Sequence, residues 1–141
     1  AVGDVYAPNS QQILAGARNE DGKGFRNIMD SIMQGRNVVK SGGANTTIGA
    51  IATNVPFNKA ELKKIAGMAH DGFARTINPI HTMWDGDTIF ALSTGKATGV
   101  EADVTAIGAI AATVMAQAVA RAVTQAESLP DLNLPAHRDY V

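Results

Sequence analysis

The chain has 141 residues, no cysteine, and 12 basic against 13 acidic side chains, giving a formal net charge of -1. This length suffices for one domain with a hydrophobic core, here a single domain fragment over residues 1–141. The lack of cysteine excludes disulfides, thiolate metal sites and a cysteine nucleophile, and fits a cytoplasmic location. The balanced charge argues against nucleic acid or a membrane surface as a partner.

The N-terminal third predicts two short strands and one helix. Residues 1–7 alternate weakly between apolar and polar types and end at a Pro-Asn-Ser turn signal, and residues 11–17 predict a returning strand. Apolar residues spaced three and four apart from Phe25 to Gln34 predict a short amphipathic helix that Gly35 ends. Because the chain opens on an apolar run without a Met or a turn signal, we expect further residues, or a separate chain, upstream of Ala1.

The central third predicts a buried strand, a long helix and a second strand. Small and β-branched residues fill the first strand, 46–54. Its two faces would carry Ile48, Ala50 and Ala52 on one side and Thr47, Gly49, Ile51 and Thr53 on the other. Helical spacing predicts a helix over 59–77, which Asn58 and Glu61 would begin in a capping-box arrangement. Residues 87–94 are rich in apolar types and predict the second strand.

The C-terminal third contains a long apolar run over 102–123. Within it, apolar residues at helical spacing from Val104 to Ala122 predict a closing helix whose small residues allow close packing. Asp103, Gln117 and Arg121 interrupt its apolar run, so we expect it to fall short of the hydrophobicity of a membrane span. Residues 128–141 are polar, contain proline and predict a surface tail. The mixture of buried strands and helices indicates an α/β fold in which helices cover sheets.

The stretch GGANTTIGAIATN, residues 42–54, leads a glycine pair into Asn45, Thr46 and the first buried strand. A hydroxyl on the C-terminal side of a peptide bond can attack the preceding carbonyl. Hydrolysis of the resulting ester leaves an N-terminal residue whose amine can act as the base for its own hydroxyl. The Asn45–Thr46 bond therefore fits self-cleavage with Thr46 as nucleophile. A loop that simply runs into a core strand would have the same local pattern, and Thr47 is a competing nucleophile.

The stretch HTMWDGDTIF, residues 81–90, places Asp85 and Asp87 around a glycine just before the second strand. The pair could orient a nucleophile or move a proton, hold a divalent cation, or form an ordinary Asp-Gly turn. No third ligand is apparent nearby, so we expect no metal. His70, inside the predicted helix, and His81 are secondary candidates for the active site. Rossmann glycine spacing and a P-loop are absent from the sequence, so we expect no cofactor.

Two segments read together resemble the C-terminal part of the DmpA-type peptidases, which include L-aminopeptidase/D-amidases, β-peptidyl aminopeptidases and the nylon-oligomer endo-hydrolase. These segments are NTTIGAIATN at 45–54 and KAELKKIAGMAHDGFARTINPIHTMWDGDTIFALSTG at 59–95. The pattern joins Asn-Thr-Thr before a strand, Met-Ala-His-Asp-Gly in a helix, and His-Thr-x-x-Asp-Gly-Asp-Thr-x-Phe before the next strand. The resemblance extends from Gly3 to about Ala126.

The resemblance implies part of an α-β-β-α sandwich like that of N-terminal-nucleophile hydrolases, and a precursor that cleaves itself into two subunits. The matching bond is Asn45–Thr46, so residues 1–45 would end the large-subunit segment and residues 46–141 would form the small-subunit segment. The implied activity is that of an amide hydrolase or aminopeptidase with Thr46 as nucleophile. Asp85 and Asp87 would support it.

The resemblance also implies partners. They are a small amide or peptide substrate, the remainder of the precursor or large subunit, and further copies in a homo-oligomer, by family habit a tetramer. Assisting Lys, Tyr and Asn groups would precede Ala1, so this polypeptide alone should be inactive. Two rival functions stay open: an acyl transferase of the ornithine-acetyltransferase type, and a non-catalytic subunit of a larger assembly.

Overall fold

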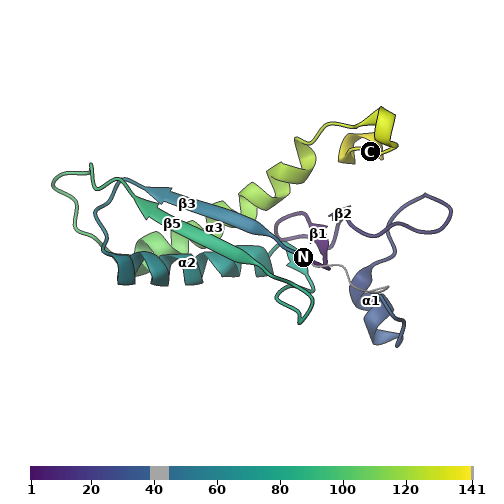
Figure 1. Ribbon diagram of the computed structural model, residues 1–141, viewed down its shortest axis with the longest axis horizontal. Helices are drawn as coiled ribbons and strands as arrows, with labels where there is room; N and C mark the ends of the chain where they lie inside the picture. The colour runs from purple at the N-terminus through teal and green to yellow at the C-terminus, as the bar shows by residue number, and fades with distance from the viewer. Residues whose placement is uncertain (39–44, 141) are drawn as a thin grey trace.

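A computed structural model describes residues 1–38 and 45–140, and its strands form two separate sheets (Figure 1). The strands are, in chain order, β1 (Asp4–Tyr6), β2 (Ile13–Ala15), β3 (Ile48–Thr53), β4 (Ile77–Asn78) and β5 (Thr88–Ser93). In the first sheet β1 pairs antiparallel with both β2 and β4. In the second sheet β3 and β5 pair in parallel, with Ile48 opposite Thr88. Since parallel neighbours need a long crossover, a helix lies between them in the chain.

The α-helices are α1 (Ile28–Met33), α2 (Lys59–Ala74) and α3 (Val104–Thr124), followed by the short 3-10 helices η1 (Pro130–Leu132) and η2 (His137–Asp139). Helices α2 and α3 lie on one face of the β3–β5 sheet, whereas α1 lies beyond the end of that sheet (Figure 1). Helix α2 packs on both α3 and β5. It begins with the predicted capping box, in which Asn58 Oδ1 accepts the Glu61 N–H and Glu61 Oε2 accepts the Asn58 N–H. The α/β class is therefore confirmed, and the full sandwich stays a prediction.

The other face of the β3–β5 sheet is exposed. Ile51 and Ile89 point inward and join a core that includes Phe73 of α2 and Met115 of α3. Alternate residues point outward, and we call the resulting surface the outer face: Ile48, Ala50, Ala52, Thr88, Phe90 and Leu92. Its large members are Ile48, 71% exposed, Phe90, 60%, and Leu92, 49%. The two predicted faces of the first strand are thus confirmed, and one of them is open apolar surface.

Helix α3 passes a simple test for a membrane span, because its most apolar window has a mean hydropathy of 1.6. The prediction that it falls short of such hydrophobicity is therefore wrong. The buried side of this helix consists of small residues and one methionine: Gly108, Ala111, Ala112, Met115, Ala116 and Ala120. The core helix of a folded domain can pass the same test. Helix α3 packs on α2 as such a core helix does.

Helix α2 ends earlier than predicted. It stops at Ala74, and Ile77 and Asn78 form β4, which pairs with β1. Ile77 is buried in the core, and the Thr76 carbonyl accepts the Tyr6 N–H at 2.7 Å. Pairing with a strand distant in the sequence therefore outweighs the helical spacing of Ile77.

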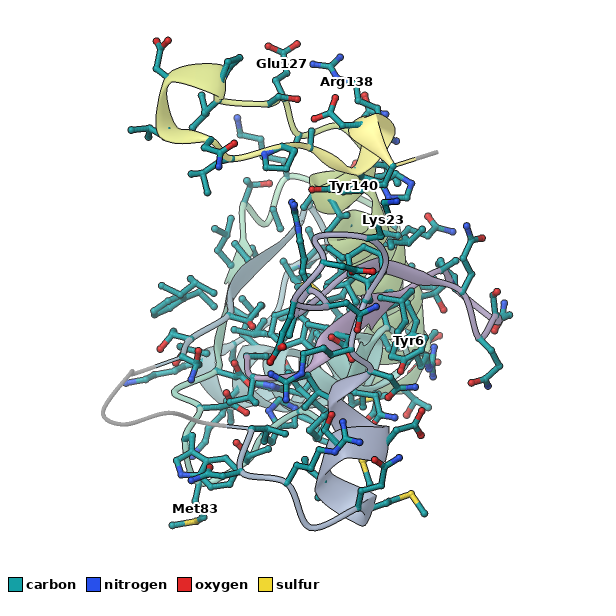
Figure 2. The ribbon with its side chains drawn as sticks, turned by 90° about the vertical axis from the view of Figure 1, so that its right-hand side faces the viewer. Tyr6, Lys23, Met83, Glu127, Arg138 and Tyr140 are labelled. Carbon is teal, nitrogen blue, oxygen red and sulfur yellow. The ribbon has the colours of Figure 1, made fainter. Side chains whose placement is uncertain are left out.

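The C-terminal segment is more than a surface tail (Figure 2). Its Ala136 is 6% exposed, and His137 Nδ1 lies 2.8 Å from the Leu14 carbonyl oxygen of β2. The ring of Tyr140 lies 4.3 Å from the Arg18 guanidinium. These contacts attach residues 128–140 to the N-terminal part of the chain.

Candidate active site

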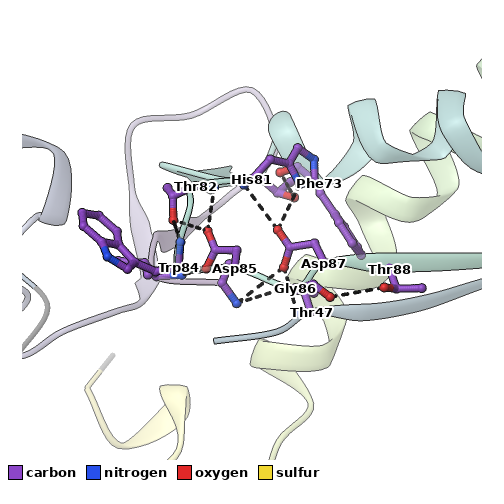
Figure 3. Close-up of polar contacts among 12 residues, drawn as sticks. Thr47, Phe73, His81, Thr82, Trp84, Asp85, Gly86, Asp87 and Thr88 are labelled. Atoms are coloured by element: carbon purple, nitrogen blue, oxygen red, sulfur yellow. Dashed lines mark hydrogen bonds and ion pairs between the residues drawn. The ribbon is translucent and has the colours of Figure 1, made fainter. Parts of the chain in front are cut away.

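The start of β3 lies beside the segment that leads into β5 (Figure 3). Asn45 forms a parallel bridge with Asp85. Its N–H donates to the Trp84 carbonyl at 3.2 Å, and its own carbonyl accepts the Gly86 N–H at 2.8 Å. The hydrogen-bond ladder between the two strands therefore extends to the N-terminal side of Ile48. It places the predicted cleavage bond opposite the Asp-Gly-Asp segment.

The Thr46 side chain is exposed and its hydroxyl lies over Gly86. A Cβ added at Gly86 would lie 3.0 Å from Thr46 Oγ1 and 4.0 Å from the Asn45 carbonyl oxygen. A contact of 3.0 Å is tighter than almost all real Cβ contacts, so a glycine at this position leaves room for the hydroxyl. Gly86 is a site residue that the sequence patterns did not predict. The glycine between two aspartates could have indicated this role, but the same Asp-Gly-Asp pattern is equally typical of a turn.

Asp87 holds the backbone of the residue that follows Thr46. Asp87 Oδ1 accepts the Thr47 N–H at 2.9 Å, and Oδ2 lies 3.0 Å from His81 Nδ1. The carboxylate is 1% exposed. Burial by itself would raise its pKa, but hydrogen bonds from Thr47 and His81 outweigh burial and lower the pKa of Asp87 below the ordinary value. Asp87 is therefore a charged group that holds the backbone of the residue after Thr46.

Asp85 fixes the turn that precedes β5. Its Oδ2 accepts hydrogen bonds from the Thr82 N–H at 3.0 Å and from the Thr82 hydroxyl at 2.8 Å. Its Oδ1 accepts the Val2 N–H at 2.8 Å. The turn itself lies just before Asp85, because the Asp85 N–H donates to the Thr82 carbonyl. The turn residues are therefore Met83 and Trp84, and Asp85 already pairs with Asn45, so the turn precedes the Asp-Gly pair.

Neither carboxylate contacts the Thr46 hydroxyl within the part of the chain that the structure describes. The four carboxylate oxygens of Asp85 and Asp87 are occupied by N–H and O–H groups of the protein. Among residues 1–38 and 45–140, no group of three or more His, Asp or Glu side chains is placed to hold a metal ion. The acidic pair thus serves to position the backbone around Thr46.

The two histidines lie together beside Asp87. The ring centroids of His70 and His81 are 4.8 Å apart, and His70 also contacts the edge of Phe73. Burial, and then the charge of His81, lower the pKa of His70. Sequence reasoning gave His81 no acidic partner. The structure pairs it with Asp87, because the chain between them folds back through the turn at Thr82.

A pocket of about 440 Å³ runs along the free edge of β3, between β1 and α3. Its lining is mainly apolar and includes Thr47 and Gly49, but Thr46 is not part of it. The pocket therefore adjoins the candidate site without including Thr46. We assign it to packing between the two sheets.

Comparison with known families defines the class of protein as a peptidase. The profile of Peptidase family S58 matches residues 7–134, which is most of the chain. The chain belongs to peptidase family S58, and the predicted resemblance to the DmpA-type peptidases is confirmed.

The relatives in this family are much longer proteins. An uncharacterized aminopeptidase of Mycobacterium tuberculosis is 46% identical over 67% of this chain and 30% of its own length. An uncharacterized aminopeptidase of Mycobacterium leprae is 44% identical over 60% of this chain and 27% of its own length. The 6-aminohexanoate-oligomer endohydrolase of Paenarthrobacter ureafaciens is 43% identical over 55% of this chain and 25% of its own length. The chain thus spans less than a third of the relatives that it matches.

Proposed function

We propose that this chain carries the nucleophile and the cleavage site of a self-processing amide hydrolase, cut between Asn45 and Thr46. One observation carries the proposal: the Thr46 hydroxyl and the Asn45 carbonyl oxygen converge on Gly86, which bonds that carbonyl at 2.8 Å. Membership of a peptidase family supports amide hydrolysis. The names of the relatives, aminopeptidase and 6-aminohexanoate-oligomer endohydrolase, support a small amide or short oligomer as substrate.

The proposed processing reaction uses only groups at the cleavage bond and water. Thr46 Oγ attacks the Asn45 carbonyl carbon, the bond to the Thr46 nitrogen breaks, and the hydroxyl proton ends on that nitrogen. Water then hydrolyses the ester, which leaves an Asn45 carboxylate and a Thr46 with a free amine. In the mature enzyme the same hydroxyl attacks a substrate amide while the amine accepts its proton, and water releases the acyl group.

The contacts of Asp87 give it a supporting role in both reactions. It fixes the Thr47 N–H and thereby the direction in which the Thr46 side chain projects. Its negative charge would also offset the positive charge of the Thr46 ammonium after cleavage. Asp85 contributes by holding the turn that presents Gly86.

The outer face supports the proposed assembly. A sheet with helices on one side and open apolar residues on the other is half of an α-β-β-α sandwich, so the rest of the protein would supply the second sheet. In that arrangement residues 46–141 form the small subunit and residues 1–45 end the large one. A tetramer of such heterodimers is part of the same proposal.

Intact mass spectrometry of the purified full-length protein tests the function directly. We expect two fragments, of which the smaller begins at Thr46, and a single uncut chain for Thr46→Ala. Thr46→Ser should still be cut, because serine supplies the same nucleophilic atom. Thr113→Ala is the matched control, since its exposed hydroxyl bonds the Ala109 carbonyl on α3, far along the chain from the cleavage bond, and it should be cut normally.

The other outcomes are equally informative. A smaller fragment that begins at Thr47 would move the nucleophile by one residue. Normal cutting of Thr46→Ala, or an uncut wild-type protein, would contradict the proposal. For the processed protein, release of product from an aminoacyl anilide without added amine would identify a hydrolase, whereas turnover that depends on an amine acceptor would identify a transferase.

A further inference from the structure

We propose that the backbone N–H of Gly86 is a catalytic donor in self-cleavage, which stabilises the negative charge that develops on the Asn45 carbonyl oxygen. The inference rests on the proposed function and names a group that the sequence reasoning did not include. It concerns the processing step, in which the acyl group that reacts belongs to the chain itself.

The geometry fits the requirement for such a donor. An effective oxyanion donor lies about 2.7–3.1 Å from the position that the charged oxygen takes in the intermediate. The Gly86 nitrogen lies 2.8 Å from the Asn45 carbonyl oxygen before the attack, and that oxygen has only a short way to move. The Asn45 N–H donates to the Trp84 carbonyl at 3.2 Å. The peptide groups on either side of the Asn45 Cα are therefore tied to one short segment. The carbonyl is held before the reaction begins, so the donor needs no rearrangement.

The hydroxyl of the proposed nucleophile, Thr46, also lies beside Gly86. A Cβ at Gly86 would meet Thr46 Oγ1 at 3.0 Å, with the Asn45 oxygen 4.0 Å away. Gly86 thus adjoins both the attacking oxygen and the oxygen that becomes negative. A side chain here would crowd the hydroxyl, whereas glycine offers its N–H without obstruction.

The step is balanced without any added reagent. The bond from Thr46 Oγ to the Asn45 carbon forms, and the carbonyl electron pair moves to the oxygen that Gly86 N–H contacts. When the pair returns, the carbon–nitrogen bond breaks and the nitrogen receives the proton that the hydroxyl lost. The product is the ester isomer of the original peptide bond, and the hydrogen bond is strongest in the charged intermediate.

The neighbouring ladder bond provides a matched comparison. The Thr88 N–H donates to the Thr47 carbonyl at 2.9 Å, in the same ladder and with almost the same length. That carbonyl is not broken in the proposed reaction. Removing either N–H should therefore weaken the ladder to a similar degree, but only the Gly86 N–H should affect chemistry.

Replacing single amide N–H groups by ester oxygens tests the inference in the full-length protein. Glycolic acid incorporated at position 86 removes only the N–H, and the α-hydroxy analogue of threonine at position 88 does the same to the control bond. We expect cleavage at Asn45–Thr46 to slow about 100-fold for the Gly86 ester, the loss typical of one oxyanion donor. The Thr88 ester should be cut at nearly the parent rate.

The outcomes separate this inference from the proposed function. A parent protein that is never cut would overturn both. A parent that is cut, together with a folded Gly86 ester that is cut equally fast, would overturn the inference alone. Equal slowing in both ester variants would also overturn it, because the effect would then come from the ladder as a whole.

A second measurement does not depend on the folding of an ester variant. In the uncut Thr46→Ala protein the Gly86 amide should exchange with deuterium as slowly as the Thr88 amide, because each has a carbonyl acceptor. After cleavage of the wild-type protein, release of Asn45 should speed exchange at Gly86 and leave Thr88 protected. Fast exchange of the Gly86 amide in the uncut protein would overturn the inference.

Discussion

Asp87 bonds the backbone next to Thr46 rather than the Thr46 hydroxyl. Its two oxygens bond the Thr47 N–H and the His81 ring. The buried carboxylate therefore fixes the backbone position of Thr47. Asp85 acts in the same way on the Thr82 turn. At the scale of single residues, the candidate site therefore consists of one exposed hydroxyl and a backbone held rigid around it.

The pKa of Asp87 predicts how stability depends on pH. Because its pKa is lower in the folded protein than in the unfolded chain, the unfolded chain binds more protons as acidity rises. The stabilisation from Asp87 is therefore complete above the ordinary aspartate pKa of about 4 and is lost as pH falls through the lower folded value. Asp87→Asn should remove this part of the pH dependence.

Urea denaturation of the full-length protein between pH 6 and pH 3 checks this expectation. The stability difference between wild type and Asp87→Asn should shrink as pH falls below about 4. Asp131→Asn is the control, since Asp131 is exposed in η1. A difference that stays constant over the whole range would contradict the assigned role of the Asp87 charge.

At the scale of elements, α2 and α3 approach closely at Gly72. A Cβ there would lie 2.4 Å from the Ala112 carbonyl oxygen and 2.6 Å from Met115 Cβ, both of α3. Backbone cannot move aside as a flexible side chain can. The close approach fits the small residues on the buried side of α3.

Two glycine substitutions on α2 should therefore act in opposite directions. Gly72→Ala should destabilise the protein by about 1–3 kcal/mol through overpacking. Gly67→Ala, on the exposed side with open space around it, should stabilise it by about 0.5–1 kcal/mol through helix propensity. Chemical denaturation of both variants measures the two effects. Equal effects of the same sign would show that the helices do not pack closely at Gly72.

The elements differ in how far the sequence predicts them. Helix α2 and its capping box are local, since Asn58, Glu61 and the apolar repeat lie within one segment. Strand β4 has only two residues and exists because Ile77 pairs with Val5, which no local pattern reveals. The position of Gly86 over Thr46 likewise depends on the register between β3 and β5. Sequence reasoning predicted Thr46, Asp85 and Asp87 through the family resemblance, and their roles stay predictions.

At the scale of the whole molecule, the outer face is the part that the described residues leave uncovered. Phe90→Lys should destabilise the full-length protein by about 3 kcal/mol or more, because a covering layer would bury the charge and lose the aromatic contact. Val100→Lys makes a similar change at an exposed apolar residue between β5 and α3, and should have little effect. Thermal unfolding and size-exclusion chromatography measure both, and equal effects would contradict a cover on the outer face.

Thr46 and Ile48 lie on the same side of the first strand, because side chains alternate along it. A second sheet packed on the outer face would stand about 10 Å away, and it would cover Thr46 as well as the apolar residues. The passage left at the end of the strands would then be about as wide as one extended chain. Under the proposed function, that width favours substrates with a free end, such as short oligomers and chain termini, over loops of folded proteins.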